Sequence, residues 1–131
     1  MRLIVGGAFQ GKKEAALAMT GLDERDVTNG ALCTAADLQS AVLLVGFHEL
    51  VRRALREDES LTMEDVEAFV RDAGTASRDL TIVANELGCG IVPMEKADRV
   101  WREKTGRLLC EIAGRADEVY TVTAGIPLRI R

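Results

Sequence analysis

The sequence predicts an α/β protein with a mostly parallel sheet and helices on both faces. Two apolar runs, residues 41–45 and 80–84, lack the regular polar alternation of a half-exposed strand. Such runs are typical of strands buried on both faces of a parallel sheet. Segments with helical periodicity alternate with the strand-like runs, as expected where helical crossovers join parallel strands. Proteins of this class bind ligands beyond the carboxyl ends of their strands.

The individual elements follow from capping signals and from local composition. Thr34 with Asp37, and Thr62 with Asp65, have the spacing of a capping box. Residues 12–19 are rich in strong helix formers. In chain order, the expected elements are a strand at 2–5, a helix at 12–19 ended by Gly21, a strand at 27–32, one or two helical turns after Thr34, a strand at 41–45, a helix at 47–56, a helix after Thr62 ended by Gly74, a strand at 80–84, a helix from Pro93 to about residue 113, a strand at 118–123, and an edge strand at 128–131 after Pro127. The last helix has one apolar face, formed by Met94, Ala97, Trp101, Leu108 and Ile112.

Size and composition predict one domain over residues 1–131, because the chain is long enough for one core and too short for two ordinary ones. The net charge of −4 gives no general reason to bind nucleic acid. No apolar run approaches the roughly 20 residues of a membrane span, and none has the form of a signal peptide. Cys33, Cys89 and Cys110 are too scattered for a disulfide framework or a zinc site. We expect structural thiols in a cytoplasmic protein.

The segment GGAFQGKK, which follows the first strand, nearly matches the phosphate-binding pattern G-x-x-x-x-G-K-[S/T]. Lys13 stands where a hydroxyl would meet Mg²⁺, so either a water takes that place or the metal step is impaired. A glycine-rich turn that opens a helix directs backbone N–H groups and the helix dipole at one point. This predicts a P-loop NTPase-like three-layer sandwich with these nucleotide-binding residues: Gly6, Gly7, Ala8, Phe9, Gln10, Gly11, Lys12 and Lys13. The alternative is a tight turn whose glycines only permit positive φ and whose lysines are solvated.

Two further segments are expected at the same edge of the sheet. Asn85 and Glu86 follow the strand at 80–84, where a carboxylate holds magnesium through water or accepts a proton from an attacking hydroxyl. The alternative is an ordinary turn with Glu86 exposed. His48, the only histidine, follows the strand at 41–45. A lone histidine at a helix start is more often structural or solvated than nucleophilic. Three basic side chains on the following helix either bind a phosphorylated substrate or form a solvated face: Arg52, Arg53 and Arg56.

The second half of the chain carries a family resemblance. The stretch NELGCGIVP matches S-N-E-x-G-x-G-I-V-P from Asn85 onward, and residues 116–127 match an ending of the form A-D-E-V-Y…V-x-A-G-I/L-P. With GGAFQGK in place of G-G-A-R-S-G-K-S, the chain resembles the adenosylcobinamide kinase / adenosylcobinamide-phosphate guanylyltransferase family of cobalamin biosynthesis. The resemblance covers the first twenty residues or so and roughly the last fifty.

The middle of the chain departs from that family in two ways. The family carries a helix after its second strand with a histidine that becomes guanylylated. Here too few residues separate the strand at 27–32 from the next strand to hold that helix, and His48 aligns with another segment. The family's third strand ends in an aspartate, where this chain has Gly46.

Three hypotheses follow for the activity. In the leading one, the resemblance implies a kinase that uses ATP or GTP, with Mg²⁺ as a possible cofactor, to phosphorylate a cobinamide-type corrinoid; Lys12 and Glu86 would be its catalytic residues, and guanylyl transfer is doubtful. The second is a catalytically silent relative that binds a nucleotide or corrinoid and acts through a partner. The third is a kinase of an unrelated small hydroxyl compound. The family also suggests a homo-oligomer.

Overall fold

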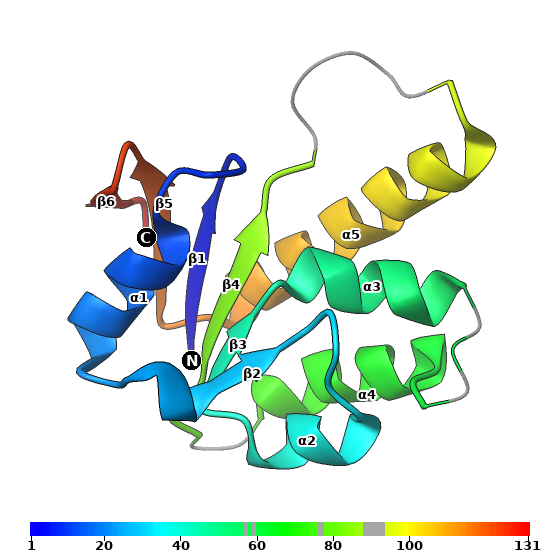
Figure 1. The fold of residues 1–131 in the computed structure, drawn as a ribbon, viewed down its shortest axis with the longest axis horizontal. Coiled ribbons are helices and arrows are strands. Elements are labelled where there is room, and N and C mark those ends of the chain that lie inside the picture. Colours follow the sequence, from blue (N-terminus) through cyan, green and yellow to red (C-terminus); the bar gives the residue numbers. More distant parts are fainter. Residues whose placement is uncertain (57, 59, 76–77, 88–93) are drawn as a thin grey trace.

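The computed structural model describes residues 1–56, 58, 60–75, 78–87 and 94–131. These residues form one sheet in the order β2-β3-β4-β1-β5-β6 (Figure 1). All neighbouring strands are parallel except β5 and β6, which form an antiparallel hairpin, so the predicted mostly parallel sheet is confirmed. The strands are β1 (Arg2–Gly6), β2 (Val27–Asn29), β3 (Leu43–Val45), β4 (Thr81–Asn85), β5 (Glu118–Thr123) and β6 (Ile126–Arg129).

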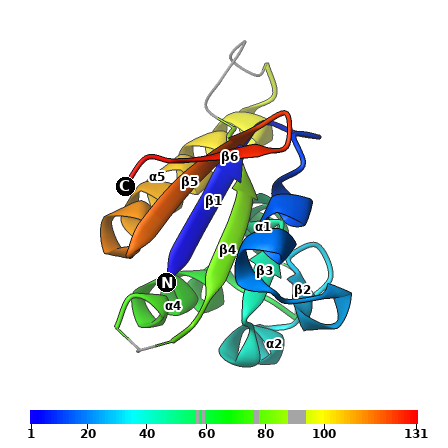
Figure 2. The ribbon, with the colours of Figure 1, turned by 90° about the vertical axis from the view of Figure 1, so that its left-hand side faces the viewer.

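Helices cover both faces of the sheet, which makes three layers (Figure 2). On one face, α1 packs over Ile4, Val83 and Val122. Helices α2 to α5 gather on the opposite face. The helices are α1 (Lys12–Thr20), a short 3-10 helix (Glu24–Asp26), α2 (Ala35–Ser40), α3 (Phe47–Leu55), α4 (Met63–Ala73) and α5 (Lys96–Arg115). In the described part of the chain, no helix combines the length and the apolarity that crossing a membrane requires.

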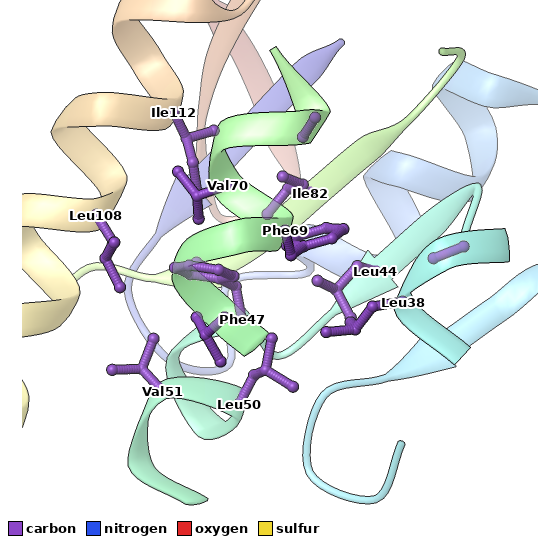
Figure 3. Packing of buried hydrophobic residues seen from close by; sticks show 14 of the residues in the cluster. Leu38, Leu44, Phe47, Leu50, Val51, Phe69, Val70, Ile82, Leu108 and Ile112 are labelled. Carbon is purple, nitrogen blue, oxygen red and sulfur yellow. The ribbon is translucent and has the colours of Figure 1, made fainter. Parts of the chain in front are cut away.

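The larger core cluster lies between the sheet and α2 to α5 (Figure 3). Phe47, at the start of α3, is fully buried between Ile82 of β4 and the helices above it. Burying one such side chain contributes about 1.5–3 kcal/mol. The start of α3 is therefore anchored in the core, and this anchoring determines where the next residue, His48, lies.

Both predicted capping boxes are present. The hydroxyl of Thr34 accepts from the backbone N–H of Asp37 at 3.3 Å, and the Asp37 carboxylate accepts from the N–H of Thr34 at 2.8 Å. Thr62 and Asp65 repeat the arrangement at 3.1 and 2.9 Å. Each cap contributes about 1 kcal/mol, which explains how a six-residue helix such as α2 begins where it does.

Several element boundaries differ from the prediction because of turns and distant contacts. The second strand ends at Asn29, whose carbonyl accepts from the N–H groups of the following turn. The third begins at Leu43, because the carbonyl of Ala41 bonds to the guanidinium of Arg78 at 2.8 Å instead of pairing in the sheet. Strand β6 begins at Ile126 rather than at residue 128, because the hairpin turn is only two residues long.

The start of the last helix also differs. Pro93 lies outside the described residues, and α5 begins at Lys96. Met94 is 93% exposed and Ala97 is exposed as well, so the expected apolar face is not buried at this end of the helix. Leu108 and Ile112 are buried as expected. Cys33 is buried and free, Cys110 is free but exposed on α5, contrary to the expected buried thiol, and Cys89 lies outside the described residues.

Candidate functional site

A pocket of about 260 Å³ lies at the carboxyl ends of β1, β3 and β4. Strands β1 and β4 are neighbours, and Gly6 pairs with Asn85, so the loops that follow these strands begin side by side. The three segments expected at this edge do meet there. The described residues that line the pocket are residues 9–14 of the loop and of α1, Val45, Gly46, His48, Val83, Ala84 and Asn85.

The loop between β1 and α1 takes a conformation that needs glycine. Gly11, the residue before α1, has φ +81°, and a Cβ there would lie 3.2 Å from the Cα of Gly125. Phe9 also has positive φ, +60°, and its side chain is fully exposed. Gly6 is the last residue of β1, and Gly7 and Ala8 follow it at the start of the loop; none of the three is among the described lining residues. The N–H groups of the first turn of a helix have no partners within the helix, which makes this end of α1 suited to an anion.

The turn between β5 and β6 is hydrogen-bonded to this loop at Gln10. The side-chain oxygen of Gln10 accepts from the N–H of Ala124 at 2.6 Å, and its carbonyl accepts from the N–H of Gly125 at 2.8 Å. Ala124 and Gly125 both have positive φ, as a two-residue hairpin turn requires. Sequence reasoning missed this contact, since only the order of strands in the sheet brings residue 124 to the loop.

Lys12 occupies the inside of the loop. Its side chain is 8% exposed, and its ammonium donates to the carbonyl of Gly7 at 2.6 Å. Burial lowers the pKa of Lys12, while the nearby Glu14 opposes the shift. The ammonium is therefore held close to the loop backbone, where a bound phosphate would meet both.

Lys13, the next residue, lines the same pocket but bonds elsewhere. Its ammonium lies 2.8 Å from a carboxylate oxygen of Glu24, in the short helix after α1. Both side chains are partly exposed.

His48 connects the three segments structurally. Gly46, with φ +84°, precedes α3 and turns the chain so that His48 faces β4. The Nδ1 atom of His48 accepts from the backbone N–H of Asn85 at 3.0 Å, which leaves the proton of the neutral ring on Nε2. Burial lowers the pKa of His48; Glu49 opposes this shift and Lys12 adds to it. The carbonyl of His48 accepts from the indole N–H of Trp101 at 2.7 Å, which ties α5 to the same point.

Asn85 and Glu86 are separated by the structure. Asn85 lines the pocket, whereas the Glu86 side chain is exposed and is not among the described lining residues. The backbone N–H of Glu86 donates to the carbonyl of Gly6 at 2.9 Å, which continues the pairing of β1 and β4 by one step. Within the NELGCGIVP stretch, residues 88–93 lie outside the described part of the chain.

The residues present do not fit a magnesium ion. Mg²⁺ requires near-octahedral oxygen ligands and is usually held by a hydroxyl or by one or two carboxylates in addition to the phosphates. Lys13 replaces the hydroxyl, Gly46 replaces the strand-end aspartate, and Glu86 points to solvent. Within the described ranges, no cluster of three or more histidine, cysteine, aspartate or glutamate side chains is arranged to hold a metal ion.

A second cavity of about 450 Å³ lies between α3 and the first half of α5. The Arg52 guanidinium lies over the Trp101 ring, 4.5 Å from its centroid, and 3.9 Å from the Asp98 carboxylate. Arg56 and Lys96 line the same cavity, while Arg53 instead bonds to the carbonyl of Gly30 at 2.9 Å. The three arginines thus differ in role, and we name this cavity the α3–α5 groove. Its described lining residues are Arg52, Leu55, Arg56, Lys96, Ala97, Asp98, Val100 and Trp101.

Comparison with known proteins identifies the family. The family model for cobinamide kinase / cobinamide phosphate guanyltransferase matches residues 18–130, which is most of the chain but begins after the loop at residues 6–13. The bifunctional adenosylcobalamin biosynthesis protein CobU of Salmonella typhimurium is 31% identical over 68 residues, and that of Escherichia coli is 30% identical over 67. The matches cover 52% and 51% of this chain, and 38% and 37% of those proteins. The chain therefore belongs to the cobinamide kinase / cobinamide phosphate guanyltransferase family.

Proposed function

We propose that the chain binds ATP or GTP at the loop of residues 6–13 and phosphorylates the hydroxyl of a cobinamide-type corrinoid in cobalamin biosynthesis. The observation that carries the proposal is the buried ammonium of Lys12 inside a glycine-rich loop at the start of α1, in a chain of this family. Phosphoryl transfer depends mainly on positioning and on charge neutralisation, and both the loop and Lys12 supply these.

In this reaction the acceptor hydroxyl oxygen forms a bond to the γ-phosphorus while the bond from that phosphorus to the β,γ-bridging oxygen breaks. The nucleoside diphosphate leaves with the electron pair of the broken bond. The hydroxyl proton passes to a base, for which we propose Glu86, the exposed carboxylate that follows Asn85 at the end of β4, just outside the described lining of the pocket. Asn85 and the backbone of the loop orient the groups around the transferred phosphate.

The α3–α5 groove is our candidate for the corrinoid site. It lies beside the first pocket, because Trp101 of the groove donates to the carbonyl of His48, which lines the pocket. The groove combines an indole ring and apolar side chains with guanidinium donors. A large ring that carries amide carbonyls would find apolar contact and hydrogen-bond donors there.

The test is transfer of labelled phosphate from ATP or GTP to cobinamide. Glu86→Gln is expected to lose turnover while it keeps nucleotide affinity, and Trp101→Leu is expected to raise the KM for cobinamide more than the KM for nucleotide. Glu95→Gln, an exposed carboxylate just before α5, is the matched control. Full activity of Glu86→Gln would rule out Glu86 as the base. An unchanged KM for cobinamide in Trp101→Leu would rule out the α3–α5 groove as the corrinoid site.

Guanylyl transfer is left out of the proposal because of the segment between β2 and β3. It holds only the six-residue α2, which contains no histidine. The one histidine of the chain, His48, is committed to Asn85 through Nδ1. Label transfer from α-labelled GTP to the protein that is lost in His48→Asn would contradict this exclusion.

A second candidate function is a catalytically silent relative that binds a nucleotide or corrinoid and acts through a partner. The observation that favours it is the poor fit of the pocket to magnesium. Nucleotide binding without any phosphate transfer to cobinamide, under conditions where a related active enzyme turns over, would support this candidate over the kinase.

We also propose that residues 1–131 form a single nucleotide-binding domain of a cytoplasmic homo-oligomer. The edge strand β6 and its extension expose Ile126, Leu128 and Ile130, at 70%, 62% and 59%, on alternate positions. A row of this kind on an edge strand favours contact with another copy. Light scattering of the purified protein tests the oligomer.

A further inference from the structure

We propose that the pocket binds the nucleotide's phosphates without magnesium, and that the ammonium group of Lys13 takes the place of the metal ion. The inference rests on the proposed nucleotide binding at residues 6–13. It concerns which cation accompanies the phosphates and it holds for an active kinase and for a silent binder alike.

The first support is the set of side chains around the pocket. Its described lining offers two ammonium groups, Lys12 and Lys13, and one carboxylate, Glu14. His48 adds no charge while Nδ1 accepts from Asn85. This set attracts an anion, and Lys13 stands at the sequence position where a phosphate-binding loop ordinarily provides an oxygen ligand for the metal.

The second support is the present partner of Lys13. Its ammonium is paired with Glu24 at 2.8 Å, and these side chains are 38% and 69% exposed. An exposed pair of this kind contributes little to stability, so exchanging Glu24 for a phosphate oxygen costs little. Lys13 follows Lys12 directly in the first turn of α1. Both lysine side chains therefore start from the N-terminal end of the helix, where the helix dipole also favours an anion.

The third support is the electrostatic repulsion between a magnesium ion and the ammonium of Lys13. A magnesium ion at its ordinary place would lie next to the ammonium of Lys13, and no hydroxyl or strand-end aspartate stands at the two positions that would compensate for this. Like charges in a partly desolvated site repel each other strongly. We therefore expect added magnesium to leave nucleotide affinity unchanged or to weaken it.

The experiment is titration of the intact chain with ATP and with GTP, in excess EDTA and in excess MgCl₂, read by calorimetry and by the fluorescence of Trp101, the only tryptophan. For the unmodified protein we expect dissociation constants that agree within about threefold, or weaker binding with magnesium. Lys13→Ser restores the hydroxyl and is expected to bind at least tenfold more weakly in EDTA, with most of the loss recovered in MgCl₂. Lys13→Met, which keeps the stem without the charge, is expected to bind weakly in both.

Glu24→Gln releases Lys13 and is expected to tighten binding in EDTA several-fold. Glu103→Gln breaks a comparable exposed pair, with Arg107 on α5, and is the matched control with unchanged affinity. Binding only in the presence of magnesium overturns the inference and leaves the proposed function standing. Lys13→Ser or Lys13→Met with unchanged affinity in EDTA, in a variant shown by circular dichroism to be folded, also overturns it. Absence of binding in both buffers overturns the inference and the proposed function together.

Discussion

Replacing Lys12 by methionine tests the phosphate-binding role of the loop with the least structural disturbance. The lysine stem is buried, and its ammonium donates to the carbonyl of Gly7 at 2.6 Å. Methionine keeps the unbranched apolar stem and removes only the charge. A hydrogen bond to a charged group contributes about 1.5–3 kcal/mol. Since 1.4 kcal/mol is tenfold in affinity, Lys12→Met is expected to weaken nucleotide binding about 10- to 150-fold.

The same variant is expected to lose nucleotide affinity without losing folding stability. Because burial holds the pKa of Lys12 below its usual value, the unfolded chain binds more protons than the folded one in the alkaline range between the two values. Stability of the unmodified protein therefore rises with pH through that range, and at neutral pH the charged ammonium is a cost. Lys12→Met is expected to be at least as stable as the unmodified protein in urea unfolding at pH 7, and to lack the alkaline rise.

The assay is calorimetric titration with ATP and GTP, paired with circular dichroism to show that the variant is folded. Lys104→Met is the control. Lys104 of α5 pairs with Glu67 of α4 at 2.7 Å and lies outside the described lining of the pocket. Its nucleotide affinity is expected to equal that of the unmodified protein. An affinity of folded Lys12→Met within threefold of the unmodified protein would refute the assignment of the loop.

Four further substitutions test the roles of single residues. Thr105→Val is expected to raise the free energy of unfolding by about 1 kcal/mol, because the Thr105 hydroxyl is buried without a partner among the described residues; destabilisation in urea would contradict this. His48→Asn keeps an acceptor for the N–H of Asn85 but cannot take a proton. Since the pKa of His48 is lowered on folding, the unmodified protein should lose stability as pH falls through the usual histidine range near 6.5, and the variant should lose less, as thermal melts from pH 8 to 5 would show. Gly46→Ala is expected to cost about 1–2 kcal/mol, because φ is +84° while a Cβ there would make only ordinary contacts, the nearest atom being 3.9 Å away. Gly30→Ala should cost more, because its Cβ would lie 2.3 Å from the carbonyl oxygen of Gly46. A Gly46→Ala variant as stable as the unmodified protein in urea would show that φ does not govern its cost, and equal costs for the two variants would contradict the clash at residue 30.

Gly46 also illustrates why the family aspartate has no simple substitute at this position. The chain here turns through the left-handed region to start α3, and this turn places Phe47 in the core and His48 against β4. An aspartate at this position would have to adopt the same left-handed backbone, which aspartate does more often than most residues other than glycine but still at an energetic cost. Restoring the carboxylate alone would therefore strain the turn that positions the neighbouring residues.

Much of the fold was predictable because its signals are local. A capping box needs only two residues three apart in the sequence, so Thr34 and Thr62 correctly predicted the starts of α2 and α4. Apolar runs without alternation indicated strands buried on both faces, and β3 and β4 are such strands. Boundaries failed where a distant group intervened, as when Arg78 took the carbonyl of Ala41 out of the sheet. No local pattern records that contact, because 37 residues separate the partners.

The sequence by itself determined the α/β class, the parallel sheet and the position of a glycine-rich loop after β1, since each depends on the side chains and backbone preferences of a few consecutive residues. Only the tertiary structure decided what surrounds that loop. The strand order brings the turn at Ala124 to Gln10 across 114 residues and Asn85 to His48 across 37. It also pairs Lys13 with Glu24 and leaves Glu86 exposed. These placements depend on which strands become neighbours, and that order is set by burial of the whole core rather than by any short stretch of sequence.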